Sequence, residues 1–251
     1  MKLIDYFDKL CIVHLPNRED RYRALEHELR VLGIDICGPK VQVPPAPMPA
    51  DANGYQSKGV HGNFLSHYEI LRDALKDGVE SVWVLEDDAI FSRYMVSEQE
   101  RTVDVLSSMP WGLCYFGHTL RRELKGAERG WVPFSGPFCW AHCYAVHSRT
   151  LARLVSYMEE TMENPPGHPR GGRLYIDAAY TLFRQMNPDV LSLVANPVMS
   201  VQKGSPSSIS ERKWYDHFRF GRLVANAARA GRDECWRRTG WYACGSGTVD
   251  L

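Results

Sequence analysis

Three consecutive carboxylates, Glu86, Asp87 and Asp88, follow the apolar residues 82–85 and precede a second β-forming stretch, residues 89–91. The first apolar run is continuous rather than alternating, which is typical of a strand buried on both faces. The acids then lie at the C-terminal end of that strand, where ligands bind in open α/β sheets. Carboxylates this close repel one another and ionise at low cost only with water, a basic partner or a cation among them. We therefore expect positive charge at this edge.

Hard carboxylate oxygens suit Mg²⁺ or Mn²⁺, which bind through one or two carboxylates and take their remaining ligands from water and substrate phosphates. An exposed acidic turn after a strand is the alternative interpretation. His142 and His147 are further metal candidates in the sequence, although most histidines of this kind have a structural role.

The composition excludes several classes of protein. The chain has 251 residues, 44% of them hydrophobic and 24% charged, which is typical of a globular protein. Its 30 basic and 30 acidic residues balance, and no nucleic-acid-binding motif is present, so we expect no nucleic-acid partner. Asp5 and Asp8 interrupt the start of the chain, and no run reaches the roughly 18 to 20 apolar residues of a membrane span. The sequence predicts a cytoplasmic protein.

Strands and helices alternate along the chain, which predicts an α/β fold. Strands are expected at residues 10–15, 41–43, 82–85, 111–117, 138–146 and 190–194, and helices at about 16–32, 64–77, 97–109, 148–160 and 175–186. The proline-rich residues 44–49 form a loop, either a plain connector or a lid over a nucleotide. Residues 118–137 are expected to be an irregular surface excursion, and residues 164–172 a second loop.

Basic and aromatic residues alternate from Lys213 onward. This pattern indicates a surface that meets phosphates, a membrane face or a partner. A C-terminal helix that packs its aromatic side chains on the core is the alternative.

Four short motifs lie in order between residue 10 and about residue 210. They are Ile12–Val13–His14–Leu15–Pro16–Asn17–Arg18–Glu19–Asp20–Arg21, then Gly62–Asn63–Phe64–Leu65–Ser66–His67, then Val84–Leu85–Glu86–Asp87–Asp88, and finally Gln202 with Ser208–Ile209. In this order they resemble glycosyltransferase family 25, the lipooligosaccharide and collagen β-galactosyltransferase group.

The resemblance implies a GT-A-like, Rossmann-type mixed sheet flanked by helices in residues 1–210. It does not cover residues 211–251, which are expected from their basic and aromatic composition to form a helical extension. It also implies transfer of a sugar, with galactose from UDP-galactose favoured, to a glycan or glycoconjugate acceptor with inversion. If the acceptor is lipid-linked, the extension would dock peripherally at the inner membrane face.

The resemblance also suggests roles for the acids. Glu86 and Asp88 have the acid-x-acid spacing of the GT-A metal motif, and side chains two apart in an extended segment point the same way. Asp88 is therefore the expected direct ligand of Mn²⁺ or Mg²⁺, with Glu86 as a water-mediated ligand or ribose contact. Asp87 would be a support or a second ligand.

Other positions are expected to bind the donor or to carry the proton transfer. Asn17, Arg18 and Arg21 follow the first strand, where a helix N-terminus and guanidinium groups can hold uridine or diphosphate oxygens. Ser66, His67 and Gln202 are further donor-binding candidates. Inversion requires a base for the acceptor hydroxyl, and Asp177 is the candidate, with Glu86 or Asp87 as alternatives. The competing structural roles are a solvated helix face for the arginines, a cap for Ser66, and a helix N-cap for Asp177.

Two other functions compete with a glycosyltransferase. One is a non-catalytic GT-A-like protein that binds a nucleotide or cation without turnover. The other is an α/β phosphohydrolase or nucleotidyltransferase, which the absence of a Gly-x-x-x-x-Gly-Lys loop disfavours.

Overall fold

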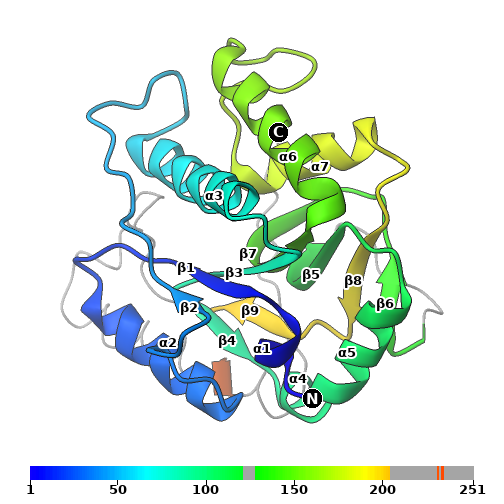
Figure 1. The fold of residues 1–251 in the computed structure, drawn as a ribbon. Helices are drawn as coiled ribbons and strands as arrows, with labels where there is room; N and C mark the ends of the chain where they lie inside the picture. The colour runs from blue at the N-terminus through cyan, green and yellow to red at the C-terminus, as the bar shows by residue number, and fades with distance from the viewer. Residues whose placement is uncertain (121–127, 204–230, 232, 235–251) are drawn as a thin grey trace.

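A mixed β-sheet lies at the centre of the fold, with helices on both of its faces (Figure 1). The structure is a computed structural model that describes residues 1–120, 128–203, 231 and 233–234. Within these residues nine strands form one sheet. They are β1 (Lys9–Val13), β2 (Val41–Gln42), β3 (Ser81–Glu86), β4 (Ala89–Phe91), β5 (Leu113–Leu120), β6 (Gly130–Pro133), β7 (Phe138–His147), β8 (Ser192–Asn196) and β9 (Ser200–Gln202).

The main path of the sheet runs β2-β1-β3-β7-β5-β8-β6, and β9 pairs with both β4 and β5. Strand β1 is parallel to β2 and β3, whereas β7 is antiparallel to β3 and β5. The mixed α/β sheet expected from the sequence is therefore confirmed.

The helices form one layer on each side of the sheet. They are α1 (Leu3–Tyr6), α2 (Glu19–Val31), α3 (Lys58–Lys76), α4 (Arg93–Ser97), α5 (Gln99–Ser108), α6 (Ser148–Glu163) and α7 (Ile176–Met186). Helices α3, α6 and α7 lie above the sheet in Figure 1, and α1, α2, α4 and α5 lie below it.

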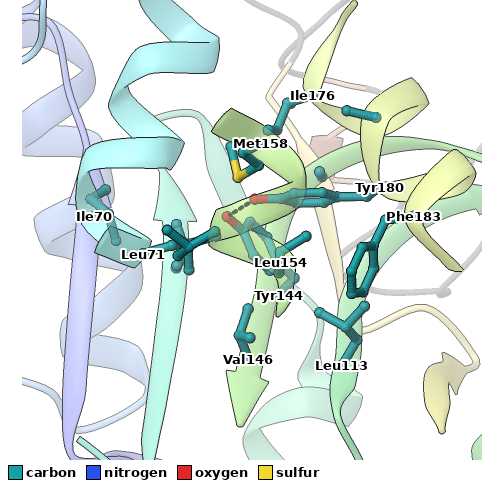
Figure 2. Packing of buried hydrophobic residues seen from close by; sticks show 14 of the residues in the cluster. Ile70, Leu71, Leu113, Tyr144, Val146, Leu154, Met158, Ile176, Tyr180 and Phe183 are labelled. Atoms are coloured by element: carbon teal, nitrogen blue, oxygen red, sulfur yellow. Dashed lines mark hydrogen bonds between the residues drawn. The ribbon is translucent and has the colours of Figure 1, made fainter. Parts of the chain in front are cut away.

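Strand β3 is the centre of both hydrophobic layers. Val82 and Val84 pack with α3, α6 and α7, whereas Trp83 and Leu85 pack against the other layer, and all four side chains are fully buried. Figure 2 shows the first of these layers, where side chains of α3, α6 and α7 close over β5 and β7. The continuous apolar run before the acids is thus explained by burial on both faces, as predicted.

Helix α3 begins earlier than predicted. It starts at Lys58 rather than Phe64 because the Ser57 side chain caps it by accepting a hydrogen bond from the backbone N–H of Val60. The residues around Gly59 and Gly62, predicted as a turn, are therefore helical. This extension matters for function because it carries the first turns of α3 to the acidic end of β3.

Two other elements were not predicted. The helix predicted at 97–109 is confirmed as α5, but the short helix α4 before it was missed. Ser92 caps α4 by accepting a hydrogen bond from the Met95 backbone N–H, and the chain leaves helical geometry at Glu98. The predicted surface excursion at 118–137 contains the end of β5 and the whole of β6, which pairs antiparallel with β8. Trp131 of β6 packs edge-on against Phe116, so this segment has a hydrophobic anchor despite its polar composition.

The predicted domain boundary at 210, the Ser208–Ile209 motif and nearly all of the extension 211–251 lie outside the described residues. Among the described helices, none has the length and apolar character needed to cross a membrane.

Gly117 of β5 allows the buried His142 imidazole to approach the backbone closely. A Cβ added at Gly117 would lie 2.2 Å from His142 Nε2 and 2.9 Å from the backbone oxygen of Ser200. We expect Gly117→Ala to reduce the free energy of unfolding by about 1 to 3 kcal/mol, the usual cost of overpacking a core. Urea denaturation measures this loss. Adding His142→Ala should recover part of it, and strict additivity of the two losses would contradict the contact.

Candidate functional site

A cavity of about 400 Å³ opens at the end of the sheet where the parallel strands β1 and β3 finish. Six chain segments form its wall: the end of β1, the start of α2, the proline-rich loop, the first turns of α3, the end of β3 and the end of β9. The lining residues are Val13, Leu15, Arg21, Ala46, Pro47, Met48, Pro49, Lys58, Gly59, Gly62, Asn63, Ser66, Glu86, Asp87, Asp88, Gln202 and Lys203. The acids therefore face a cavity, as expected for the carboxyl edge of an α/β sheet.

Positive charge meets the acids, as predicted. Arg21 of α2 places one guanidinium nitrogen 2.9 Å from Asp87 Oδ1 and 3.2 Å from Asp88 Oδ2. His14 Nδ1 lies 2.9 Å from the other oxygen of Asp87. Asp87 is only 6% exposed and is held between these two groups, an arrangement that suits a support for Arg21.

Asp88 has an oxygen available for a ligand. Its Oδ1 is buried and makes no hydrogen bond with the described protein atoms, whereas its Oδ2 faces Arg21. Burial, and next the charge of Glu86, raise the pKa of Asp88 to about 7, and Arg21 only partly opposes this shift. A buried carboxylate oxygen without a partner fits a hard divalent cation such as Mn²⁺ or Mg²⁺.

Glu86 is occupied by hydrogen-bond donors from three segments. Its Oε1 accepts from Asn63 Nδ2 at 3.2 Å and lies 3.3 Å from His67 Nε2, and its Oε2 accepts from Gln202 Nε2 at 3.0 Å. Burial would raise the pKa of Glu86, but the hydrogen bond from His67, with smaller effects of His142 and Asn63, lowers it to about 2. This occupation favours Asp88 over Glu86 as a direct metal ligand.

A buried chain of hydrogen bonds supports Glu86 from behind. His67 Nδ1 lies 2.7 Å from the Tyr144 hydroxyl, which lies 2.7 Å from the Tyr180 hydroxyl (dashed in Figure 2). All three side chains are fully buried. The chain of hydrogen bonds runs from α3 through β7 to α7, so it ties the position of Glu86 to both of these helices.

The described residues contain no group of three or more His, Cys, Asp and Glu side chains that could by themselves hold a metal ion. A cation such as Mg²⁺ needs only one or two carboxylates when substrate phosphates and water complete its shell, so Asp88 remains compatible with one. The two histidines considered as further metal candidates have other surroundings. His142 is fully buried, and burial lowers its pKa to about 4. His147 is the N-cap residue of α6.

The structure separates the other predicted donor-binding residues into two groups. Ser66 lines the cavity, with its hydroxyl donating to the backbone oxygen of Gly62, and Gln202 lines it beside Glu86. Arg18 instead makes two hydrogen bonds to Asp20, and neither Arg18 nor Asn17 is among the lining residues.

Asp177 does not line this cavity. It is the second residue of α7, and its carboxylate accepts hydrogen bonds from the backbone N–H groups of Trp140 and Ala178. Trp140 has a φ of 70°, a backbone conformation uncommon for a bulky residue, and Asp177 holds it there. Burial raises the pKa of Asp177, and the charge of Glu86 adds to the shift.

The lining residues that were not predicted as site residues include Met48, Lys58, Asn63 and Lys203. Met48 belongs to the proline-rich loop that lines the cavity, and it is a large hydrophobic residue that is 78% exposed. A cap signal at Ser57 could have extended α3 and so placed Lys58 and Asn63 beside Glu86. No local signal marks Lys203, whose backbone N–H bonds to the Asp88 carbonyl across the β4–β9 pair.

No protein-family model matches the chain, and no curated protein sequence matches it. Solved structures of low similarity include a glycosyltransferase involved in the glycosylation of the major capsid of PBCV-1, with 13% identity, a TM-score of 0.48, and coverage of 92% of this chain and 98% of that one. Another is 4-diphosphocytidyl-2C-methyl-D-erythritol synthase from Anaerococcus prevotii DSM 20548, with 12% identity, a TM-score of 0.40, and coverage of 90% and 88%.

A third is the apo form of the glycosyltransferase GlyE of Streptococcus pneumoniae TIGR4, with 10% identity, a TM-score of 0.38, and coverage of 96% of this chain and 66% of that chain. At TM-scores below 0.5 these similarities assign no family and no activity. The function must be argued from the site itself.

The chain from His67 to Tyr180 can be broken at its middle member. Tyr144→Phe removes the shared hydroxyl and leaves the buried His67 and Tyr180 polar groups without that partner. We expect a loss of about 1 to 3 kcal/mol in the free energy of unfolding. The matched control is Tyr68→Phe, which removes a surface hydrogen bond to Glu159 and should change stability by less than about 0.5 kcal/mol. Equal effects of the two substitutions in urea denaturation would refute the role of the chain.

His118 predicts a pH dependence of stability. It is buried at the end of β5, and burial lowers its pKa from 6.5 to about 4, although its Nε2 bonds to the Ala195 carbonyl. As the pH falls, His118 is protonated in the unfolded chain before it is protonated in the folded protein. The contribution of His118 to the free energy of unfolding is therefore present above pH 6.5 and is lost as the pH falls through the folded-state pKa near 4.

His118→Gln keeps a donor for Ala195 and does not titrate. Its stability relative to the wild type should therefore rise as the pH falls from about 6.5 to 4. Denaturation curves at several pH values measure this slope, which is independent of any constant cost of the substitution. Parallel pH profiles for the two proteins would contradict the assignment.

Proposed function

We propose that the protein is a metal-assisted glycosyltransferase that moves a sugar from a nucleotide sugar to a glycan or glycoconjugate acceptor. This proposal rests on the observation that both negatively and positively charged side chains line one cavity. Asp88 presents a buried carboxylate oxygen that has no hydrogen-bond partner among the described residues, while Arg21, Lys58 and Lys203 line the same cavity. A diphosphate with a bound divalent cation has the complementary charges.

The cationic residues are placed to bind a diphosphate. Lys58 and Gly59 belong to the first turn of α3, where backbone N–H groups and the helix dipole favour an anion. Lys203 lies on the opposite wall, next to the Asp88 carbonyl. These groups hold the phosphates while the bond between the sugar and the diphosphate breaks.

Asp88 is the residue that would hold Mn²⁺ or Mg²⁺. When bound, such a cation stabilises the negative charge that develops on the leaving diphosphate. Arg21 shares its guanidinium between Asp87 and Asp88, so it keeps the acids in place and neutralises part of their charge. Asp87 is accordingly proposed as a support for Arg21 rather than as a base.

Asp177 is proposed as the base that takes the proton of the acceptor hydroxyl. This role is supported by the raised pKa of Asp177, which is caused by burial and increased by the negative charge of Glu86. The acceptor would then approach from the side of α7 and Trp140. Because Asp177 lies outside the wall of the cavity, this role requires the acceptor to extend beyond it.

The finer parts of the proposal come from the resemblance to glycosyltransferase family 25. They are galactose as the sugar, UDP as its carrier and inversion at the anomeric carbon. A cytoplasmic location is proposed from the acidic residues at the start of the sequence and the lack of a long apolar run. Peripheral docking at the inner membrane face through residues 211–251 is proposed from the basic and aromatic composition of that segment alone.

The decisive experiment is a panel of nucleotide sugars assayed for nucleotide release with Mn²⁺ or Mg²⁺. We expect release from one donor, dependent on the cation, and a reduction of at least about 100-fold in Asp88→Asn, since one electrostatic contact to the transition state is worth this much. Asp73→Asn, on the exposed surface of α3, is the matched control and should retain wild-type activity.

The acceptor is unidentified, so the panel includes calorimetric binding of UDP and UDP-galactose. Nucleotide-sugar binding without release, in the presence of mixed glycan acceptors, would favour the non-catalytic binding protein. Release that is unchanged in Asp88→Asn would overturn the assignment of the metal ligand.

A further inference from the structure

Glu86 determines which way the Asn63 side chain faces. An amide can turn either its NH₂ group or its oxygen toward a neighbour, and the two are told apart by the hydrogen bonds around them. Glu86 also receives hydrogen bonds from His67 and Gln202, so it acts as an acceptor. The NH₂ group of Asn63 must therefore face Glu86, at 3.2 Å, and its oxygen must face away.

The oxygen of Asn63 has no hydrogen-bond partner within the described residues. Asn63 Oδ1 is buried, and the residue lines the cavity. A buried acceptor left unsatisfied is destabilising, so such an atom in a native site is expected to meet a donor from a ligand. Asn63 thus presents a fixed, neutral acceptor to whatever fills this part of the cavity.

The position of Asn63 indicates which part of a ligand it would meet. Glu86 accepts a hydrogen bond from Asn63, and the negative charge of Glu86 helps to raise the pKa of both Asp88 and Asp177. In the proposed reaction the transferred sugar must lie between the diphosphate, near Asp88, and the base, at Asp177. A sugar ring carries hydroxyl groups, which are the donors that a neutral amide oxygen needs.

We propose that Asn63 is a specificity-determining residue whose amide oxygen, directed by Glu86, accepts a hydrogen bond from a hydroxyl group of the transferred sugar. This inference rests on the proposed glycosyltransferase function and adds a determinant of which sugar is accepted. Asn63 discriminates because a donor sugar without the matching hydroxyl leaves the buried oxygen unpaired. A hydroxyl with the wrong configuration has the same consequence.

The test combines changes in the protein with changes in the ligand. Binding of UDP, UDP-galactose, UDP-glucose and the monodeoxy analogues of UDP-galactose is measured by calorimetry with Mn²⁺, for the wild type and Asn63→Ala. We expect the substitution to weaken binding of the preferred nucleotide sugar by about 10- to 100-fold and to leave UDP binding within about twofold.

The monodeoxy analogues identify the contact itself. One of them should bind the wild type about 10- to 100-fold more weakly than the parent sugar but should bind Asn63→Ala as well as the parent does. This loss of discrimination is not expected from a purely structural role, which would weaken all ligands alike. Circular dichroism checks the fold, and Asn63→Ser, whose hydroxyl is too short to replace the amide oxygen, is the second variant.

The outcomes separate the two proposals. Equal weakening of UDP and of the nucleotide sugar would place Asn63 at the nucleotide and overturn the inference while leaving the proposed function intact. Unchanged binding in both Asn63 variants would also overturn it. A wild type that binds none of the nucleotide sugars and releases nucleotide from no donor would overturn the inference together with the proposed function.

Discussion

The structure of the site depends on how the protein accommodates three adjacent carboxyl groups at a largely buried edge of the sheet. The three acids have different surroundings. Asp87 is held between Arg21 and His14, Glu86 receives three hydrogen-bond donors, and Asp88 keeps one oxygen unpaired and has a raised pKa. Because these partners come from α2, α3 and β9, the three acids connect both helical layers to strand β9. The same partners that stabilise the acids also define the cavity.

The unequal treatment of the acids suggests a division of labour in the proposed reaction. Asp87 and Glu86 orient other side chains, the first by holding Arg21 and the second by holding Asn63 and Gln202. Asp88 alone presents a buried oxygen that lacks a partner within the described residues, so it is the carboxylate available to a cation. The hydrogen bonds from His67 to Tyr180 hold Glu86 in place from its buried side. Rigid support of this kind is what a site needs to discriminate between closely similar sugars.

Much of the fold could be predicted because local patterns and burial agree. The apolar run before Glu86 predicted a strand buried on both faces, and Val82 and Trp83 indeed belong to opposite layers. The predicted helices at 148–160 and 175–186 correspond to α6 and α7. Predictions failed where a side-chain contact or pairing with a distant strand determined the local structure, because local composition does not report these interactions. Ser57 extended α3 by capping it, and β6 formed within a polar segment because Trp131 packs against Phe116.

The sequence by itself determined that the acids end a buried strand and that positive charge must accompany them, since both follow from hydrophobic pattern and charge repulsion. Only the tertiary structure decided which residues supply that charge and which atoms stay available for a ligand. Arg21 is 66 positions from Asp87, and Gln202 is 116 positions from Glu86, so no local pattern could pair them. The orientation of Asn63 likewise follows from its bond to Glu86 across two elements. Hydrogen bonding is directional and acts over about 3 Å, so the site exists only once the chain has folded.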